Sequence, residues 1–255
     1  MKFSISKSLG ITLALFPLLF LLGLSLMAQW SYPELSPQEW TLLQWKRLWG
    51  GSNGLRSSLS LSLGLSLGVA SFATGLGFFS SRVIAYHPQK ALFRLLAYFP
   101  FVLTPVIYAA CVYYFFIRLG LNGQIWGVLL AQLMIAYPYA VILGVEFWNE
   151  RMKDLINLAY TLGANERATW MRVIWPASRG ILLLIFFQTF LISWFEYGLT
   201  TLIGVGKVQT LTVKVFQFIH EANPYLAALS GLLLAFPPIL LLWINRRFVF
   251  KTQLT

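Results

Sequence analysis

Few side chains in this sequence can carry acid–base or ion-binding chemistry. Glu196 is a carboxylate inside an apolar stretch that also holds Trp194 and Tyr197, and Tyr137 lies in another apolar stretch. A charge in such surroundings is costly and by default functional, and both carboxylates and aromatic faces attract cations. These four residues therefore predict a pathway for a small cationic solute. The alternative is a glutamate that hydrogen-bonds to polar neighbours or to a partner subunit.

No combination of residues predicts an enzyme active site. The segment 64–68, Gly-Leu-Ser-Leu-Gly, matches a hydrolase nucleophile elbow, but that motif needs a strand–turn–helix and a histidine partner. The only histidines, His87 and His220, fall in or near loops, and the single cysteine, Cys111, has no disulfide partner in the chain. There is no metal-ligand spacing and no Gly-x-x-x-x-Gly-Lys-Ser/Thr phosphate loop. We expect no catalytic residues, no metal, no cofactor and no ATP bound in that loop.

The composition excludes a water-soluble globule. Of the 255 residues 58% are hydrophobic and 11% are charged, against about 25% charged in soluble domains. A membrane-spanning helix needs about 20 apolar residues. Six segments meet this length: 9–28, 59–79, 95–117, 124–145, 180–203 and 224–244. The sequence therefore predicts an all-α membrane protein with six transmembrane helices.

The basic residues predict the orientation of these helices. The net charge is +11, and six of the 19 Lys and Arg residues fall on one side of a six-helix topology. These six are Lys46, Arg47, Arg56, Arg118, Lys207 and Lys214. The positive-inside rule puts the other thirteen, and both termini, in the cytoplasm. We therefore expect a multi-pass membrane protein with no nucleic-acid partner.

The loops suggest two parts. Residues 1–54 hold the first helix, which is too long for a signal peptide, and most of an outer tryptophan-rich loop, 29–58. Residues 55–255 form a core domain of five helices with a cytoplasmic loop, 146–179. Ser60, Gly64 and Gly68 recur every four residues and predict a close helix–helix approach. Pro100 and Pro105 predict a kink in the third helix.

The cytoplasmic loop carries an amphipathic pattern. Leu155, Leu158, Ala159 and Leu162 recur at three- and four-residue intervals, which is typical of one face of a helix. Gly163 suits a left-handed helix end. Asn165 is a suitable cap for a second short helix, 166–174, which we expect Pro176 to close. The loop is thus predicted as helix–turn–helix, with an apolar face that needs a partner groove.

The same loop resembles a family motif. Residues 157–164, Asn-Leu-Ala-Tyr-Thr-Leu-Gly-Ala, and 173–176, Val-Ile-Trp-Pro, resemble the EAA loop of binding-protein-dependent ABC importer permeases. That pattern is Glu-Ala-Ala, three residues, Gly, nine residues, then Ile-x-Leu-Pro. Ala159, Gly163 and Pro176 match at the same spacing. Asn157 and Leu158 stand where the family has Glu-Ala, and Trp175 stands where it has Leu.

Three further segments resemble the spermidine/putrescine-type permeases. Residues 190–197 resemble an acidic stretch in the fifth helix of that subgroup, and 209–216 resemble an outer Thr-Leu-Pro-x-Lys segment. Residues 101–105 also resemble a segment of that subgroup. The likeness covers roughly residues 57–245.

The resemblance implies the type I ABC importer permease fold and a non-enzymatic subunit that forms half of a transport pathway. Its implied partners are ABC ATPase subunits, a second permease subunit, a periplasmic or lipid-anchored solute-binding protein and membrane lipid. The implied cargo is a polyamine or another cation, with iron and thiamine as the nearest competitors. A non-transporting scaffold subunit and an intramembrane enzyme remain alternatives. The residues implied to couple to the ATPase are Asn157, Leu158, Ala159, Leu162, Gly163, Ala164 and Pro176.

Overall fold

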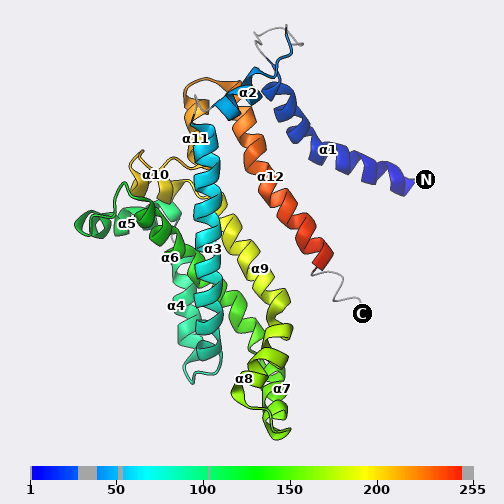
Figure 1. The fold of residues 1–255 in the computed structure, drawn as a ribbon, viewed down its shortest axis with the longest axis vertical. Helices are drawn as coiled ribbons and strands as arrows, with labels where there is room; N and C mark the ends of the chain where they lie inside the picture. The colour runs from blue at the N-terminus through cyan, green and yellow to red at the C-terminus, as the bar shows by residue number, and fades with distance from the viewer. Residues whose placement is uncertain (1, 28–38, 51–53, 103, 249–255) are drawn as a thin grey trace. The chain divides into compact units, whose positions relative to one another are not determined.

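The computed structural model describes residues 2–27, 39–50, 54–102 and 104–248. In these ranges the chain is helical, with one isolated bridge between Met27 and Trp40 and no strand (Figure 1). The helices are α1 (Lys2–Ser25), α2 (Leu43–Gly50), α3 (Leu55–Ala85), α4 (Lys90–Val102), α5 (Pro105–Arg118), α6 (Ile125–Phe147), α7 (Glu150–Thr161), α8 (Glu166–Thr169), the π-helical turn η1 (Trp170–Ile174), α9 (Trp175–Trp194), α10 (Gly198–Gly204), α11 (Leu211–His220) and α12 (Pro224–Phe248).

Four helical stretches within the described residues are long and apolar enough to cross a membrane. They are Leu55–Ala85, Ile125–Phe147, Glu166–Trp194 and Pro224–Leu242. Two shorter apolar helices, Leu15–Ser25 and Val106–Arg118, accompany them. The protein is therefore all-helical and has the character of a multi-pass membrane protein, as the composition predicts.

The chain divides into two compact units, which are described separately. The terminal unit comprises residues 1–62 and 209–239, and the central unit comprises 63–208 and 240–255. In the terminal unit Trp45 Nε1 donates to Ser25 Oγ over 3.3 Å, and the backbone N–H of Leu211 donates to Ser62 Oγ over 2.6 Å. Of the predicted outer loop, 29–58, residues 29–38 and 51–53 lie outside the described part. The predicted boundary at residue 54 stays a prediction.

In the central unit, α3 and α6 approach each other closely at small residues. A Cβ atom added at Gly77 would collide with Ala140, and one added at Gly144 would collide with Ser81. Small residues permit such an approach between helices. The sequence placed the approach earlier on α3, but at Gly64 an added Cβ would meet open space. At Gly68, the last residue of the predicted stripe, it would lie 3.6 Å from Leu129 Cδ1 on α6, an ordinary contact. The tightest approach, at Gly77, lies about two and a half turns further along the helix.

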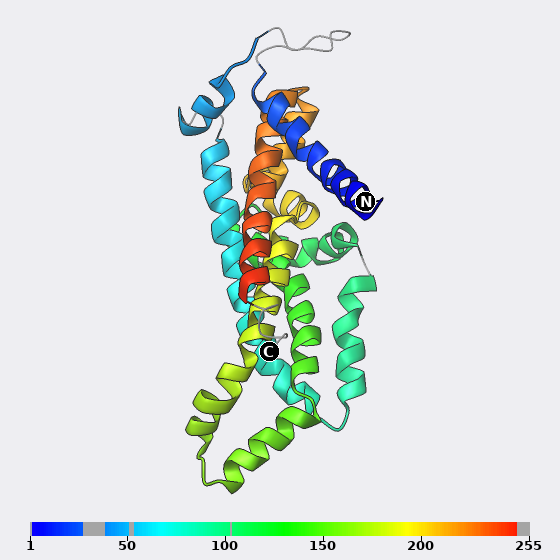
Figure 2. The same cartoon turned by 90° about the vertical axis from the view of Figure 1, so that its right-hand side faces the viewer.

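The predicted third transmembrane helix, 95–117, is two helices, α4 and α5 (Figure 2). Helix α4 ends at Val102, and α5 begins at Pro105. Proline disfavours helical geometry in the residue that precedes it. Thr104 is accordingly extended and accepts a hydrogen bond from Ile107 N over 3.4 Å, which caps α5. Proline thus ends one helix and begins another instead of bending a single one.

The predicted fifth helix, 180–203, also differs from the structure. Helix α9 ends at Trp194, and α10 begins at Gly198. Glu196 lies in the break between them and not within a helix. The N-terminus of α10 packs tightly against that of α5, because a Cβ added at Gly198 would lie 2.7 Å from Val106 Cγ2.

The prediction that Pro176 closes a short helix is wrong. Helices α8 and α9 run continuously through the π-turn η1, in which Trp175 N donates to the carbonyl of Trp170, five residues earlier. Proline lacks an N–H, and its ring clashes with the carbonyl four residues before it. A widened π-turn accommodates such a break in the hydrogen-bond ladder. The helix therefore continues past Pro176 as a single span, Glu166–Trp194.

Candidate functional site

Helix α7 projects at one end of the central unit, beyond the ends of α3 and α6 (Figures 1 and 2). Asn149 caps it by accepting from Met152 N over 3.0 Å, and Glu150 in the first turn complements the helix dipole. Met152, Ile156 and Ala159 are buried along one face. This face holds α7 against the rest of the unit.

The contact beneath α7 is a dense apolar cluster. Phe78, Trp148, Met152, Ile156 and Ile174 are buried together, and the rings of Phe78 and Trp148 lie 5.1 Å apart. Because these residues come from α3, the end of α6, α7 and η1, a force applied to α7 reaches several helices at once.

Two polar contacts fix the same cluster. Trp148 Nε1 donates to Ser81 Oγ over 3.1 Å, so the indole is hydrogen-bonded although it is buried. The guanidinium of Arg82 lies 5.6 Å from the ring centre of Trp148 and 5.2 Å from that of Trp170. A cation over aromatic faces is stabilising. The base of α7 is therefore anchored on α3.

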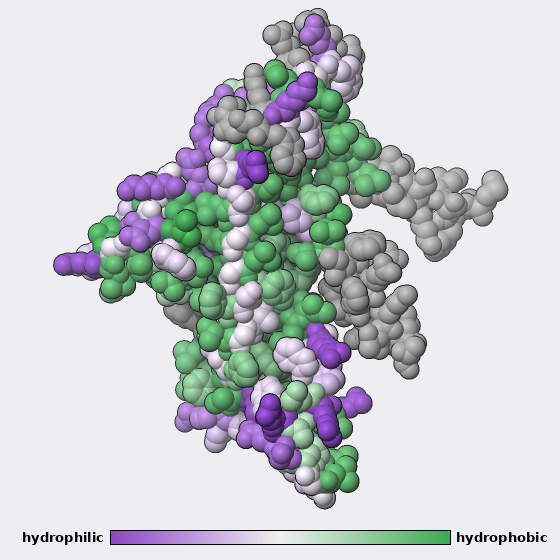
Figure 3. All heavy atoms as spheres, in the orientation of Figure 1, coloured by the Kyte–Doolittle hydropathy of each residue, from purple (hydrophilic) through white to green (hydrophobic). Residues whose placement is uncertain are grey.

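A second face of α7, adjacent to the buried one, is apolar and exposed. The residues opposite the buried face are polar, namely Asp154, Asn157 and Thr161. Leu155, Leu158 and Leu162 expose 41%, 55% and 78% of their surface. The sequence predicted these leucines and Ala159 as one stripe, but Ala159 faces inward. Figure 3 shows many hydrophilic residues gathered at this end of the central unit, over α7 and α8. An exposed apolar patch with a polar rim marks an interaction surface.

The end of α7 is fixed by its backbone. Gly163 has φ +84°, its N–H donates to Tyr160 O over 2.9 Å, and Ala164 N donates to Ala159 O over 3.0 Å. This pair of bonds is the Schellman ending, which requires a left-handed residue at the position of Gly163. The glycine prediction is confirmed, and the turn presents Leu162 at its tip.

The structure gathers six of the seven predicted coupling residues on this helix and its turn. Asn157 is exposed on α7, and Ala164 is half-buried just after the turn. Pro176 lies apart from them, in the first turn of α9. Residues 157–164 of the family-like motif thus form the projecting tip, and residues 173–176 belong to the helical stretch that carries it.

A buried polar chain crosses the central unit. Ser193 Oγ donates to Gln132 Oε1 over 2.6 Å and lies 3.2 Å from Ser66 Oγ, whose hydroxyl is therefore the donor between the two serines. Gln132 Nε2 donates to Thr200 Oγ1 over 2.9 Å, and Thr200 Oγ1 donates to Glu196 Oε2 over 3.0 Å. The chain joins α3, α9, α6 and α10.

Glu196 ends this chain and caps α10. Its Oε1 accepts from Leu199 N over 2.8 Å, and its Oε2 accepts from Thr200 N over 2.9 Å. Both carboxylate oxygens of Glu196 therefore accept hydrogen bonds from groups of this protein. The carboxylate holds the break between α9 and α10 in place, and the first N–H groups of α10 hold the carboxylate.

The aromatic residues predicted beside Glu196 differ in their surroundings. Trp194 is buried to 1% exposure and stacks on Phe190 with ring centres 5.6 Å apart. Tyr137 and Tyr197 are half-buried. Sequence reasoning missed Gln132, Ser66 and Thr200, although a glutamine within an apolar span was a signal that could have identified the polar chain.

Thr200→Val is expected to destabilise the protein, because it leaves the buried Gln132 amide without its acceptor and Glu196 without one donor. An unpaired buried group costs roughly 1–3 kcal/mol. We expect a thermal midpoint several degrees lower in detergent, and a similar fall for Glu196→Gln, since an amide nitrogen cannot accept. Thr201→Val is the control, because that exposed hydroxyl bonds only to Tyr197 O. An unchanged midpoint in Glu196→Gln with reduced cation uptake would instead favour a role of the carboxylate in the pathway.

No protein-family model matches this sequence, and no curated protein matches it either. The likeness to importer permeases stays a prediction from the sequence segments.

Proposed function

We propose that this protein is a permease subunit of an ATP-binding-cassette importer and that α7 is the helix that docks on a separate ATPase subunit. The observation that carries the proposal is the projecting helix with its buried face anchored and its leucine face exposed.

The anchoring supplies a mechanism for coupling. When the ATPase binds ATP and closes, a helix seated in its groove is moved with it. Because α7 shares one packed cluster with α3, α6 and η1, the movement reaches the helices of the pathway as a rigid shift. ATP biases this equilibrium only through its different affinities for the two states of the complex.

Six membrane crossings are part of the proposal. Helix α1 would form the first crossing, and α4 together with α5 would form the third. The four long apolar stretches would form the other four crossings. Both termini and α7 would then lie in the cytoplasm of a bacterial cell. A second permease subunit would complete the pathway, and a binding protein outside the cell would deliver a small solute. A polyamine or another cation stays the predicted cargo.

Cysteine labelling tests the topology. In a Cys111→Ala background, Glu221→Cys should react with a membrane-impermeant maleimide added to intact cells, and Arg167→Cys should react only after the cells are opened. Both native side chains are exposed, so accessibility within the fold does not limit the reaction. The opposite pattern would contradict the proposed orientation, and with it the docking of α7 on a cytoplasmic ATPase.

A further inference from the structure

An apolar groove runs between α3 and α9 in the central unit. Its volume is about 640 Å³. Its walls include Thr74, Gly75 and Phe79 from α3 and Leu183 and Phe186 from α9. Both helices belong to stretches long and apolar enough to cross a membrane. The groove is therefore a surface whose natural surroundings are hydrocarbon.

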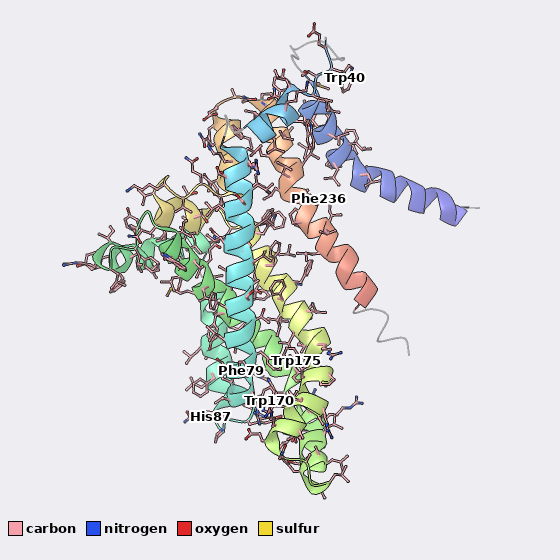
Figure 4. The ribbon with its side chains drawn as sticks, viewed as in Figure 1. Trp40, Phe79, His87, Trp170, Trp175 and Phe236 are labelled. Carbon is pink, nitrogen blue, oxygen red and sulfur yellow. The ribbon has the colours of Figure 1, made fainter. Side chains whose placement is uncertain are left out.

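One end of the groove differs from the other. Trp170, Trp175 and Arg179 lie at the end nearer α7, where Figure 4 shows Phe79, Trp170 and Trp175 between α3 and α9. Tryptophan is enriched where hydrocarbon meets water, and arginine binds phosphate oxygens with its planar fork. Among the residues that the structure describes, Arg179 is the only charged one that lines the groove, and it is exposed.

The length of the groove fits one leaflet. From Trp175 to Phe186 a helix rises about 17 Å. Half of the hydrocarbon core is about 15 Å. A lipid with its headgroup at the basic end, near Trp175 and Arg179, would extend its acyl chain along the groove toward Phe186. Figure 3 shows a pale stripe along α3 with hydrophobic residues on both sides of it, and hydrophilic residues gathered toward α7.

We propose that the groove between α3 and α9 binds one anionic phospholipid, with an acyl chain along Gly75 and Leu183 and the phosphate on Arg179. The site is distinct from the leucine face of α7 and holds whether or not that face docks on an ATPase. The lipid would lie beside η1 and contact Trp170 and Phe79, whose rings lie 5.8 Å apart. Trp170 packs against the apolar cluster that anchors α7.

The full-length protein, purified in mild detergent and exchanged into nanodiscs, tests this. Native mass spectrometry with equal amounts of phosphatidylglycerol and phosphatidylcholine should find one retained phosphatidylglycerol. Gly75→Leu should abolish retention, because an added Cβ there meets open space and the larger side chain fills the groove without a clash. Arg179→Gln should lower the preference for phosphatidylglycerol about fivefold.

Two matched variants complete the experiment. Gly64→Leu adds the same side chain on α3, also into open space but away from the groove, and should retain the lipid. Arg172→Gln removes an exposed arginine that does not line the groove and should keep the preference. Equal retention of both lipids by the native protein, or equal effects of Gly64→Leu and Gly75→Leu, would overturn the proposal. A Gly75→Leu variant that loses a protein partner and no lipid would show that another subunit covers the groove.

Discussion

Gly163→Val is expected to abolish ATP-driven transport and to reduce co-purification of the ATPase, while the protein still inserts into the membrane. Gly163 has φ +84°, and a β-branched residue there is strained by roughly 1–3 kcal/mol. An added Cβ meets no neighbour, so the strain lies in the backbone alone. The turn would relieve it by losing the Schellman bonds to Tyr160 and Ala159, and Leu162 would leave its position.

Gly180→Val is the matched control for this prediction. Gly180 lies within α9, an added Cβ there also meets open space, and its φ is not positive. Transport by this variant should stay near the native level. If Gly163→Val also transports normally, with the ATPase bound as before, the turn after α7 is not the coupling element.

The second large effect is expected for Leu158→Ala combined with Leu162→Ala. Both side chains are exposed in this chain, so their loss costs the isolated protein little. In a docked complex they would be buried, and removing two buried leucine side chains forfeits roughly 3 kcal/mol or more. Affinity for the ATPase should fall about a hundredfold, measured by titrating the separately purified ATPase onto the immobilised permease.

A leucine elsewhere separates docking from general hydrophobicity. Leu119→Ala removes a similarly exposed leucine, 70% exposed, at the end of α5 and outside the proposed docking face. Its affinity for the ATPase should match that of the native protein. Equal losses in the two variants, or no loss in either, would mean that α7 does not bind the ATPase.

The regular helices were predictable because their signals are local. The predicted second, fourth and sixth spans lie within α3, α6 and α12, where uninterrupted apolar runs decide the structure. The glycine ending of α7 was predictable for the same reason, because the requirement for a left-handed residue lies in the residue itself.

The breaks were not predictable from the same patterns. Residues 95–117 read as one apolar run, yet the residue before Pro105 cannot readily stay helical, and Thr104 caps a new helix. At Pro176 the error was the opposite one. The sequence predicted the end of a helix, but the helix continues past the proline through a π-turn. Whether proline ends a helix depends on what surrounds it, and hydropathy carries no information on that.

The polar chain depends on tertiary pairing. Ser66, Gln132 and Thr200 come from three helices and are separated by 61 residues or more from the partners that they meet on other helices. In the sequence nothing local pairs any of these residues with the others. The sequence identified the carboxylate but could not show that both its oxygens are bound to α10.

Photo-cross-linking from α7 tests the central claim most directly. Leu158→Cys in a Cys111→Ala background is coupled to a photoreactive maleimide, and the protein is irradiated in membranes of its own source. We expect one cross-linked protein that also incorporates 8-azido-ATP, and no such product from Leu119→Cys. A cross-linked protein that does not bind the nucleotide, or the same product from both positions, would contradict the assignment of α7 as the ATPase-docking helix.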